Sequence, residues 1–246
     1  MKIKNKISFL EIEEIWFANE NDFNINCMFS LKVYRDARKN IKKLFCFQEK
    51  KYTLYTNLNE NSDYIFKLFT SNLRNEIRKV DKLDNCLVEL NSIEKNEFIE
   101  FYNIFADSKN LPLLTNRRLE KYGDNLFYIS AKLDDELTNI QVYVTDYENK
   151  IIRLLYSVST IHGLDDKTTR NRIGWINKVL HWNAMVYFKD KGFEIFDWGG
   201  YGNDENNQEL AGIDKFKKSF GGEVIEVYDY YSLPVFILKK LKELKS

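Results

Sequence analysis

Asp197 is the carboxylate whose position most favours chemistry. It ends an apolar segment in which Phe193, Ile195 and Asp197 would share one face of a strand. A carboxylate at the end of an apolar row must find hydrogen-bond donors or act as a base, because burial raises the pKa of an acid. The other interpretation is a turn aspartate that accepts from amides of the glycine pair Gly199 and Gly200. The sequence leaves both interpretations open.

The two histidines, His162 and His181, differ in their surroundings along the chain. His162 follows an expected central strand and could act as a general base, with a solvated loop histidine as the alternative. His181 lies within a long expected helix beside Trp182, which favours a structural role. Neither histidine has paired carboxylates at the spacing of metal ligands, so we expect no metal site.

An anion-binding site is predicted at the start of the long helix, which we expect over residues 171–191. Arg170, Arg172 and Gly174 cluster there. The free amides and the positive end of a helix attract an anion, a glycine allows its close approach, and two guanidinium groups add positive charge. An ordinary helix start with solvated arginines is the alternative.

The elements that must position these residues follow in order from residue 86. The pattern of apolar and turn residues predicts a strand, two helices, a three-stranded antiparallel meander, the long helix, a strand, a short helix and a last strand. The expected meander strands cover 126–133, 140–145 and 151–158, and the later elements cover 193–197, 214–220 and 224–230. This order predicts an α/β fold with a mixed sheet flanked by helices, because the long helix must cross over between neighbouring strands.

Residues 1–85 have a different pattern of apolar and turn residues. They contain short apolar segments at 7–15, 27–34, 44–47 and 52–58, separated by turn residues, and then one helix capped by Ser62 and running to Val80. This stretch is too short for a second full domain. We therefore expect a partial, strand-rich N-terminal lobe at 1–85 and a main domain at 86–246.

The composition limits the classes of partner. Lys+Arg and Asp+Glu both total 37, so the formal net charge is zero, which argues against a nucleic acid or an anionic membrane as the main partner. The widely spaced cysteines Cys27, Cys46 and Cys86 predict free thiols in a reducing compartment. Acidic residues interrupt the first apolar run and no segment is long enough to span a bilayer, so we expect a cytoplasmic protein.

The predicted order of elements resembles that of GNAT acyltransferases, and three segments sharpen the likeness. Residues 180–184, 191–200 and 212–223 resemble the C-terminal GNAT half of Fem-type aminoacyltransferases, with Phe-Lys-x-x-Phe-Gly-Gly at 216–222 as the most specific part. The basic stretch 74–79 also fits, and the resemblance covers about residues 64–230. Full-length Fem enzymes contain two GNAT-like domains, and this chain is too short for both.

The resemblance implies a donor site and a catalytic cation. In the GNAT fold the pantetheine of the donor enters where two central strands separate, here 151–158 and 193–197, and its pyrophosphate lies at the start of the next helix. The resemblance thereby implies donor contacts at Ser157, Val158, Arg170, Arg172, Gly174 and Trp175. Lys217 would steady the donor or the developing oxyanion. By position alone, Lys217 could equally be one of three solvated lysines with Lys215 and Lys218.

The expected function is therefore N-acyl transfer. An acyl group, with acetyl first, would pass from a CoA thioester to a primary amine, for which an amino sugar of a surface polysaccharide or a peptide amine is the expected class. Catalysis would rest on Asp197, Lys217 and His162. Two alternatives stay open: a Fem-like transferase that takes its acyl group from aminoacyl-tRNA, and a GNAT-shaped binding protein without catalysis. The sequence does not predict an oligomeric state.

Overall fold

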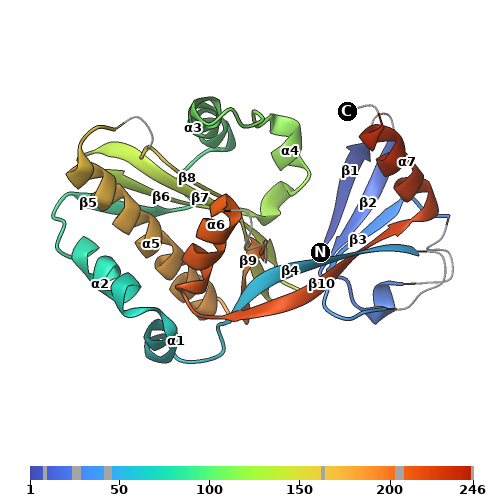
Figure 1. The fold of residues 1–246 in the computed structure, drawn as a ribbon, viewed down its shortest axis with the longest axis horizontal. Coiled ribbons are helices and arrows are strands. Elements are labelled where there is room, and N and C mark those ends of the chain that lie inside the picture. The colour runs from blue at the N-terminus through green and yellow to red at the C-terminus, as the bar shows by residue number, and fades with distance from the viewer. Residues whose placement is uncertain (8–9, 24–28, 42–45, 162–163, 203–207, 245–246) are drawn as a thin grey trace.

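One mixed sheet runs through the protein (Figure 1). The computed structural model describes residues 1–7, 10–23, 29–41, 46–161, 164–202 and 208–244. In this part of the chain the strands are β1 (Lys2–Ile7), β2 (Leu10–Trp16), β3 (Lys32–Ala37), β4 (Cys46–Asn57), β5 (Cys86–Leu90), β6 (Leu126–Leu133), β7 (Glu136–Asp146), β8 (Ile151–Ser159), β9 (Ile195–Gly200) and β10 (Glu223–Ser232). Their order across the sheet is β1-β2-β3-β10-β4-β9-β8-β7-β6-β5. The pairs β2–β3 and β8–β9 are parallel, and the other neighbouring pairs are antiparallel.

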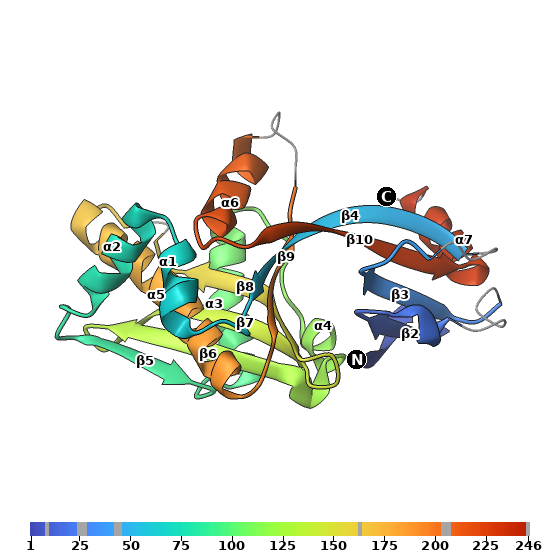
Figure 2. The ribbon, with the colours of Figure 1, turned by 90° about the horizontal axis from the view of Figure 1, so that it is seen from below.

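Helices cover both faces of the β5–β9 half of the sheet (Figure 2). The helices of the described residues are α1 (Ser62–Leu68), α2 (Ser71–Val80), α3 (Lys95–Ser108), α4 (Asn116–Glu120), α5 (Lys167–Asp190), α6 (Gln208–Lys218) and α7 (Leu233–Glu243), with short 3-10 turns at Glu20–Asp22 and Gly123–Asn125. Successive side chains of a strand point to opposite faces of the sheet, so neighbouring residues pack under different helices. Tyr143 packs in the core beneath α1, α2 and α5, whereas its neighbour Val142 packs with α3 and α4.

The long helix α5 is held by its apolar stripe. Ile173, Ile176, Leu180, Ala184 and Phe188 are all buried, as their helical spacing predicts. They pack in the same core as residues of the central strands and of α1 and α2. Each large apolar side chain buried in this way stabilises the fold by about 1.5–3 kcal/mol. This packing fixes α5 against β6, β7 and β8.

Two long strands join the larger body to a smaller lobe. β4 and β10 pair antiparallel from Tyr55–Glu223 to Cys46–Ser232 and extend from the centre of the sheet into the lobe that holds β1, β2, β3 and α7 (Figure 2). Helices α1 and α2 lie in the larger body, because α2 packs on α5. The sheet is thus continuous across the lobes, and the boundary at residue 85 stays a prediction.

Several predicted bounds need correction. The single helix expected from Ser62 to Val80 is two helices, because the backbone turns to extended geometry at Phe69 and Thr70, and Thr70 caps the second helix. The strands expected at 44–47 and 52–58 are one strand, β4. α5 begins at Lys167, four residues before the expected start at 171.

Cys86 is a free, half-buried thiol, Cys46 is also half-buried, and Cys27 lies outside the described residues. Among the described helices, none has the length and apolar composition needed to cross a bilayer.

Candidate active site

The central strands β8 and β9 separate at the middle of the sheet. Their parallel pairing begins at Ile151–Ile195 and ends at Arg153–Asp197, although both strands continue. On its other edge β8 carries a bulge, because Tyr143 pairs with Leu154 and Val142 with Tyr156. A pocket of about 300 Å³ lies at this separation. We call it the splay pocket; it is lined by Trp16, Arg153, Leu154, Leu155, Ser157, Trp198, Gly199, Gly200 and Lys217.

The splay pocket is lined from both faces of the sheet. Ser157 pairs with Gln141 of β7, and Arg153 pairs with Val144 of β7. Gln141 and Val144 are an odd number of residues apart and point to opposite faces of the sheet, so Ser157 and Arg153 do so too. Ser157 donates a hydrogen bond from Oγ to Asn177 Oδ1 of α5 at 3.0 Å. The Arg153 guanidinium lies 5.2 Å from the ring of Trp16 in the smaller lobe. A substrate can thus be contacted at this point from the α5 side and from the opposite side.

Lys217 is the lysine of α6 that reaches the splay pocket. Its ammonium group donates to the carbonyl oxygen of Gly200 at 2.5 Å. Burial lowers the pKa of Lys217, and the Asp214 carboxylate opposes this shift. Lys215 and Lys218 are exposed and line a different pocket. The environment of Lys217 suits a cation that acts on a developing negative charge.

Asp197 is fully buried and is not among the residues that line either described pocket. Its Oδ1 accepts from the hydroxyl of Thr53 and from the amide of Gly199 at 2.9 Å, and its Oδ2 accepts from Arg153 at 3.1 Å. Burial raises the pKa of Asp197, while the guanidinium of Arg153 opposes the shift. The bond from the Gly199 amide is the one that a turn-capping aspartate makes, and Asp197 also forms an ion pair with Arg153. A catalytic role for Asp197 stays a prediction.

Arg153 is a site residue that the sequence reasoning missed. Its Nη1 bonds Asp36 of β3 at 2.5 Å as well as Asp197 of β9. Burial alone would lower the pKa of Arg153, but the two carboxylates outweigh it and hold the pKa above its ordinary value. The signal was present, because an arginine interrupts the apolar run from Ile151 to Leu155. Trp16 gave no such signal, since it comes from the other lobe.

The start of α5 is already capped by the protein. The side chain of Asp166 accepts from the amides of Thr168 and Thr169 at 3.1 and 2.8 Å. The amide of Arg170 bonds the Asp166 carbonyl at 3.0 Å. An anion at this helix start would therefore compete with a carboxylate for the same amides.

The remaining predicted donor contacts are dispersed. Arg170 is exposed and Arg172 half-buried, in the first two turns of α5. Gly174 lies deeper in the helix, where an added Cβ would meet only the side chain of Ile161, at 3.9 Å. The ring of Trp175 faces the Lys79 ammonium at 4.4 Å. Val158 is buried against the α3 side of the sheet, and of the predicted donor residues Ser157 alone lines the splay pocket. The donor contacts stay predictions.

Of the two histidines, His162 lies outside the described residues. His181 is fully buried, with Nδ1 3.1 Å from the hydroxyl of Tyr143. Burial, and then the charge of Lys217, lower the pKa of His181 to about 3, so it is neutral at physiological pH. No group of His, Cys, Asp and Glu in the described ranges could hold a metal ion.

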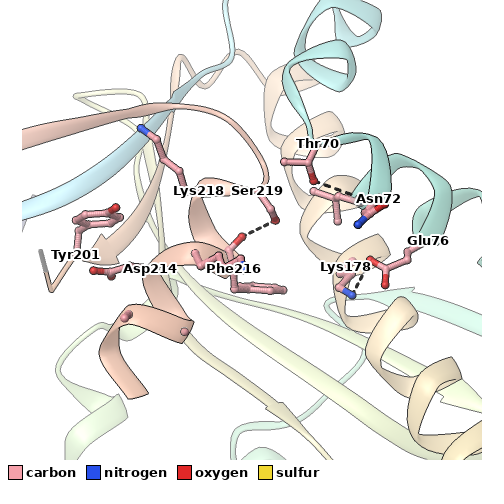
Figure 3. A pocket seen from close by; sticks show the side chains of 13 residues that line it. Thr70, Asn72, Glu76, Lys178, Tyr201, Asp214, Phe216, Lys218 and Ser219 are labelled. Atoms are coloured by element: carbon pink, nitrogen blue, oxygen red, sulfur yellow. Dashed lines mark hydrogen bonds and ion pairs between the residues drawn. The ribbon is translucent and has the colours of Figure 1, made fainter. Parts of the chain in front are cut away.

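A larger pocket of about 770 Å³ lies between α6 on one side and α2 with α5 on the other (Figure 3). Polar side chains dominate the part that the figure labels, and Glu76 pairs with Lys178 at 2.8 Å across α2 and α5. Phe216 lines this pocket and its neighbour Lys217 lines the splay pocket, so the end of α6 borders both.

Solved structures share this fold over almost the whole chain. The crystal structure of FemX superposes with a TM-score of 0.68 at 12% identity, covering 96% of this chain and 85% of that one. L-PGS from Bacillus licheniformis gives a TM-score of 0.59 at 13% identity, with 96% and 83% covered. The C-terminal domain (DUF2156) of a putative lysylphosphatidylglycerol synthetase from Agrobacterium fabrum gives 0.56 at 11%, with 99% and 84% covered.

These likenesses confirm the predicted mixed α/β, GNAT-like fold and its resemblance to Fem-type proteins. At such identities they show the fold alone. No family model matches the chain, and a search of curated proteins finds no match.

Proposed function

We propose that this protein is an acyltransferase that moves an acyl group from an activated carbonyl donor onto a primary amine in the splay pocket. The observation that carries the proposal is the position of Lys217, a half-buried cation at the point where β8 and β9 separate. A half-buried, fixed cation stabilises negative charge better than one in bulk solvent.

The chemistry follows from this position. The lone pair of the amine nitrogen attacks the carbonyl carbon, and the carbonyl oxygen takes the negative charge of a tetrahedral intermediate. Lys217 would donate to that oxygen in place of the Gly200 carbonyl. When the carbonyl re-forms, the leaving thiol or hydroxyl departs with a proton, and the proton lost by the amine passes to water or to a base. The reaction needs positioning and charge stabilisation.

Two donors fit this chemistry. A CoA thioester is the donor that the resemblance implies, with its pyrophosphate at the start of α5. Aminoacyl-tRNA is the second candidate, and the capping of that helix start by Asp166 favours it, since an ester at the end of a tRNA needs no pyrophosphate site there. The fold likeness to the C-terminal domain of a protein described as a putative lysylphosphatidylglycerol synthetase, a name that denotes an aminoacyl product, supports the same candidate.

For the acceptor we propose the class that is consistent with the resembled family, a primary amine on a sugar or a peptide. An amino sugar of a surface polysaccharide is the first candidate. The size of the larger pocket, about 770 Å³, supports an acceptor or donor larger than a free amino acid.

A donor screen tests the proposed function. Thermal unfolding would be followed with acetyl-CoA, longer acyl-CoAs, bare CoA and aminoacyl-tRNA, because a ligand that binds the folded state raises the midpoint. Each donor that raises it would then be incubated with glucosamine and with triglycine, and acylated products sought by mass spectrometry. We expect one donor class to bind and to yield an N-acyl product. Binding without any product would favour the non-catalytic alternative, and neither binding nor product would refute the proposal.

A further inference from the structure

A chain of hydrogen bonds, exposed at Ser157 and buried at His181, links the splay pocket to the core between β7 and α5. Ser157 Oγ bonds Asn177 Oδ1 at 3.0 Å, and Gln141 Nε2 bonds the same oxygen at 3.0 Å and the Asn177 backbone carbonyl at 2.9 Å. Tyr143 bonds Gln141 Oε1 at 2.6 Å and lies 3.1 Å from Nδ1 of His181. Gln141, Tyr143 and His181 are fully buried.

One backbone carbonyl fixes the direction of every bond in this chain. A carbonyl can only accept, so the Gln141 atom beside the carbonyl of Asn177 is the amide nitrogen. Oε1 of Gln141 must then accept, and the Tyr143 hydroxyl donates to it. The Asn177 side-chain atom that also meets the Gln141 nitrogen must be its oxygen. Ser157 therefore donates its only hydroxyl proton to Asn177.

The same logic determines the tautomer of His181. The hydroxyl proton of Tyr143 is already given to Gln141, so the Tyr143 oxygen can only accept from His181. Nδ1 of His181 thus carries the proton and Nε2 a bare lone pair. Among the described residues Nε2 has no hydrogen-bond partner. The histidine is a neutral anchor for the chain.

At the other end, the polarity of the chain decides what Ser157 offers to a substrate. Its proton is committed to Asn177, and the side chain is exposed in the lining of the splay pocket. Only the oxygen lone pairs remain for a ligand. A hydroxyl of this kind accepts hydrogen bonds, and does so more strongly because its own proton is donated.

We propose that Ser157 is a substrate-binding residue whose oxygen accepts a hydrogen bond from an N–H of the acceptor amine, with Asn177, Gln141, Tyr143 and His181 as the positioning residues that fix its polarity. Such a bond would hold the nitrogen in the pocket that Lys217 lines, with its lone pair free to turn toward the carbonyl carbon. The inference rests on the proposed acyl transfer, since it names the group that receives the amine.

The kinetic test compares Ser157→Ala with Ser157→Thr. Loss of the acceptor oxygen should raise the KM for glucosamine or triglycine about tenfold, and threonine should restore the KM. A loss of donor affinity with an unchanged KM for the amine would contradict the inference and favour the donor contact that the resemblance implies for Ser157. Gln141→Met cuts the chain without touching the pocket, and should raise the same KM severalfold. A merely structural Gln141 would lower the melting temperature and leave the KM of the folded enzyme unchanged, which would contradict the inference.

Two spectroscopic measurements test the inference independently of catalytic turnover. In a His162→Gln background His181 is the remaining histidine, and its ¹⁵N shifts should report a proton on Nδ1 and a bare Nε2. Titration of glucosamine or triglycine into the wild type should shift the backbone amide signal of Ser157. If acyl transfer is never observed, the proposed function fails while these signals still decide the inference. A proton on Nε2, or no shift at Ser157 with either amine, overturns it.

Discussion

Lys217 differs from its lysine neighbours in what surrounds its ammonium group. It lines the splay pocket and bonds Gly200, whereas Lys215 and Lys218 are exposed on the other side of α6. Lys217→Met should therefore lower the acyl-transfer rate about a hundredfold or more, with the fold retained. Lys215→Met and Lys218→Met are the matched controls and should keep nearly normal rates. Equal losses in all three variants would contradict a specific role for Lys217.

His181 makes the stability of the protein depend on pH. Its pKa is about 3 in the folded state against 6.5 for a free imidazole, so the unfolded chain binds the proton first as the pH falls. The stabilisation is complete above about pH 6.5 and is lost as the pH falls from there toward 3, by up to about 1.4 kcal/mol per pH unit. Urea unfolding between pH 4 and 7 would measure this slope. In a His162→Gln background, the further change His181→Leu should reduce this slope by the contribution of about one bound proton. An unchanged slope would show that folding does not lower the pKa of His181.

The contacts of Asp197 favour its turn-capping interpretation, and its catalytic role stays untested. Asp197→Asn keeps the shape but removes the charge that faces Arg153, which retains its bond to Asp36. We expect a loss of about 1–3 kcal/mol in unfolding free energy, unchanged donor affinity, and a maximal rate within about tenfold of normal. Denaturant unfolding and turnover should be measured on one preparation. A hundredfold lower rate in a stable variant would instead support the general base that the sequence suggested.

The sequence located part of this site and could not locate the rest. Asp197 and Lys217 were singled out from local patterns, and the structure joins both to the glycine pair, through the Gly199 amide and the Gly200 carbonyl. Arg153 owes its importance to Asp36, a residue 117 positions away. Pairing at that distance has no local signature in one sequence. The polarity of Ser157 likewise depends on Asn177 and Gln141, which packing brings beside it.

At the scale of single elements, α5 contains a glycine that its backbone does not require. Gly174 has no positive φ, and an added Cβ would meet only Ile161, at 3.9 Å. Gly174→Ala should therefore raise the unfolding free energy by about 0.5–1 kcal/mol, because alanine loses less backbone entropy in a helix. Thermal or urea unfolding would measure it. If CoA affinity falls in the same variant while stability rises, the glycine serves the close approach of a phosphate.

Close packing requires glycine at Gly221 and Gly222, the two residues that precede β10. An added Cβ at Gly222, where φ is +89°, would lie 2.5 Å from the backbone carbonyl oxygen of Tyr55 in β4. Gly222→Ala should destabilise the fold by about 3 kcal/mol or more, from the clash and the strained φ together. Gly123, at φ +52° with no atom within 4 Å of the added Cβ, is the matched control and should cost about 1 kcal/mol as alanine. Similar losses at both positions would mean that the backbone angle alone matters.

Elements whose evidence is local were predicted well. The meander of β6, β7 and β8 and the helix α5 follow from periodicity within one segment, and both are confirmed. The break between α1 and α2 was missed because the apolar stripe continues through it, from Ile65 to Leu73. The unity of β4 was missed because its middle is polar and is held by pairing with distant β10.

At the scale of the whole molecule, the smaller lobe completes the site. Trp16 of β2 lines the splay pocket, and Asp36 of β3 holds the Arg153 guanidinium from the same side. Neither residue belongs to the region whose sequence resembles the GNAT half of Fem-type proteins. The lobe therefore contributes to the pocket directly, in addition to extending the sheet.

The place of β10 in the sheet has a consequence for the order of folding. β10 lies between β3 and β4, which are close in sequence to each other and lie 168 to 198 residues before their partners in β10. While the chain is being synthesised, the edges of β3 and β4 that will bind β10 stay unpaired until residue 232 has left the ribosome. Contacts of such long sequence separation form late and slowly. A nascent chain accordingly keeps these strand edges open until β10 has been made, and in that period a chaperone would be of most use.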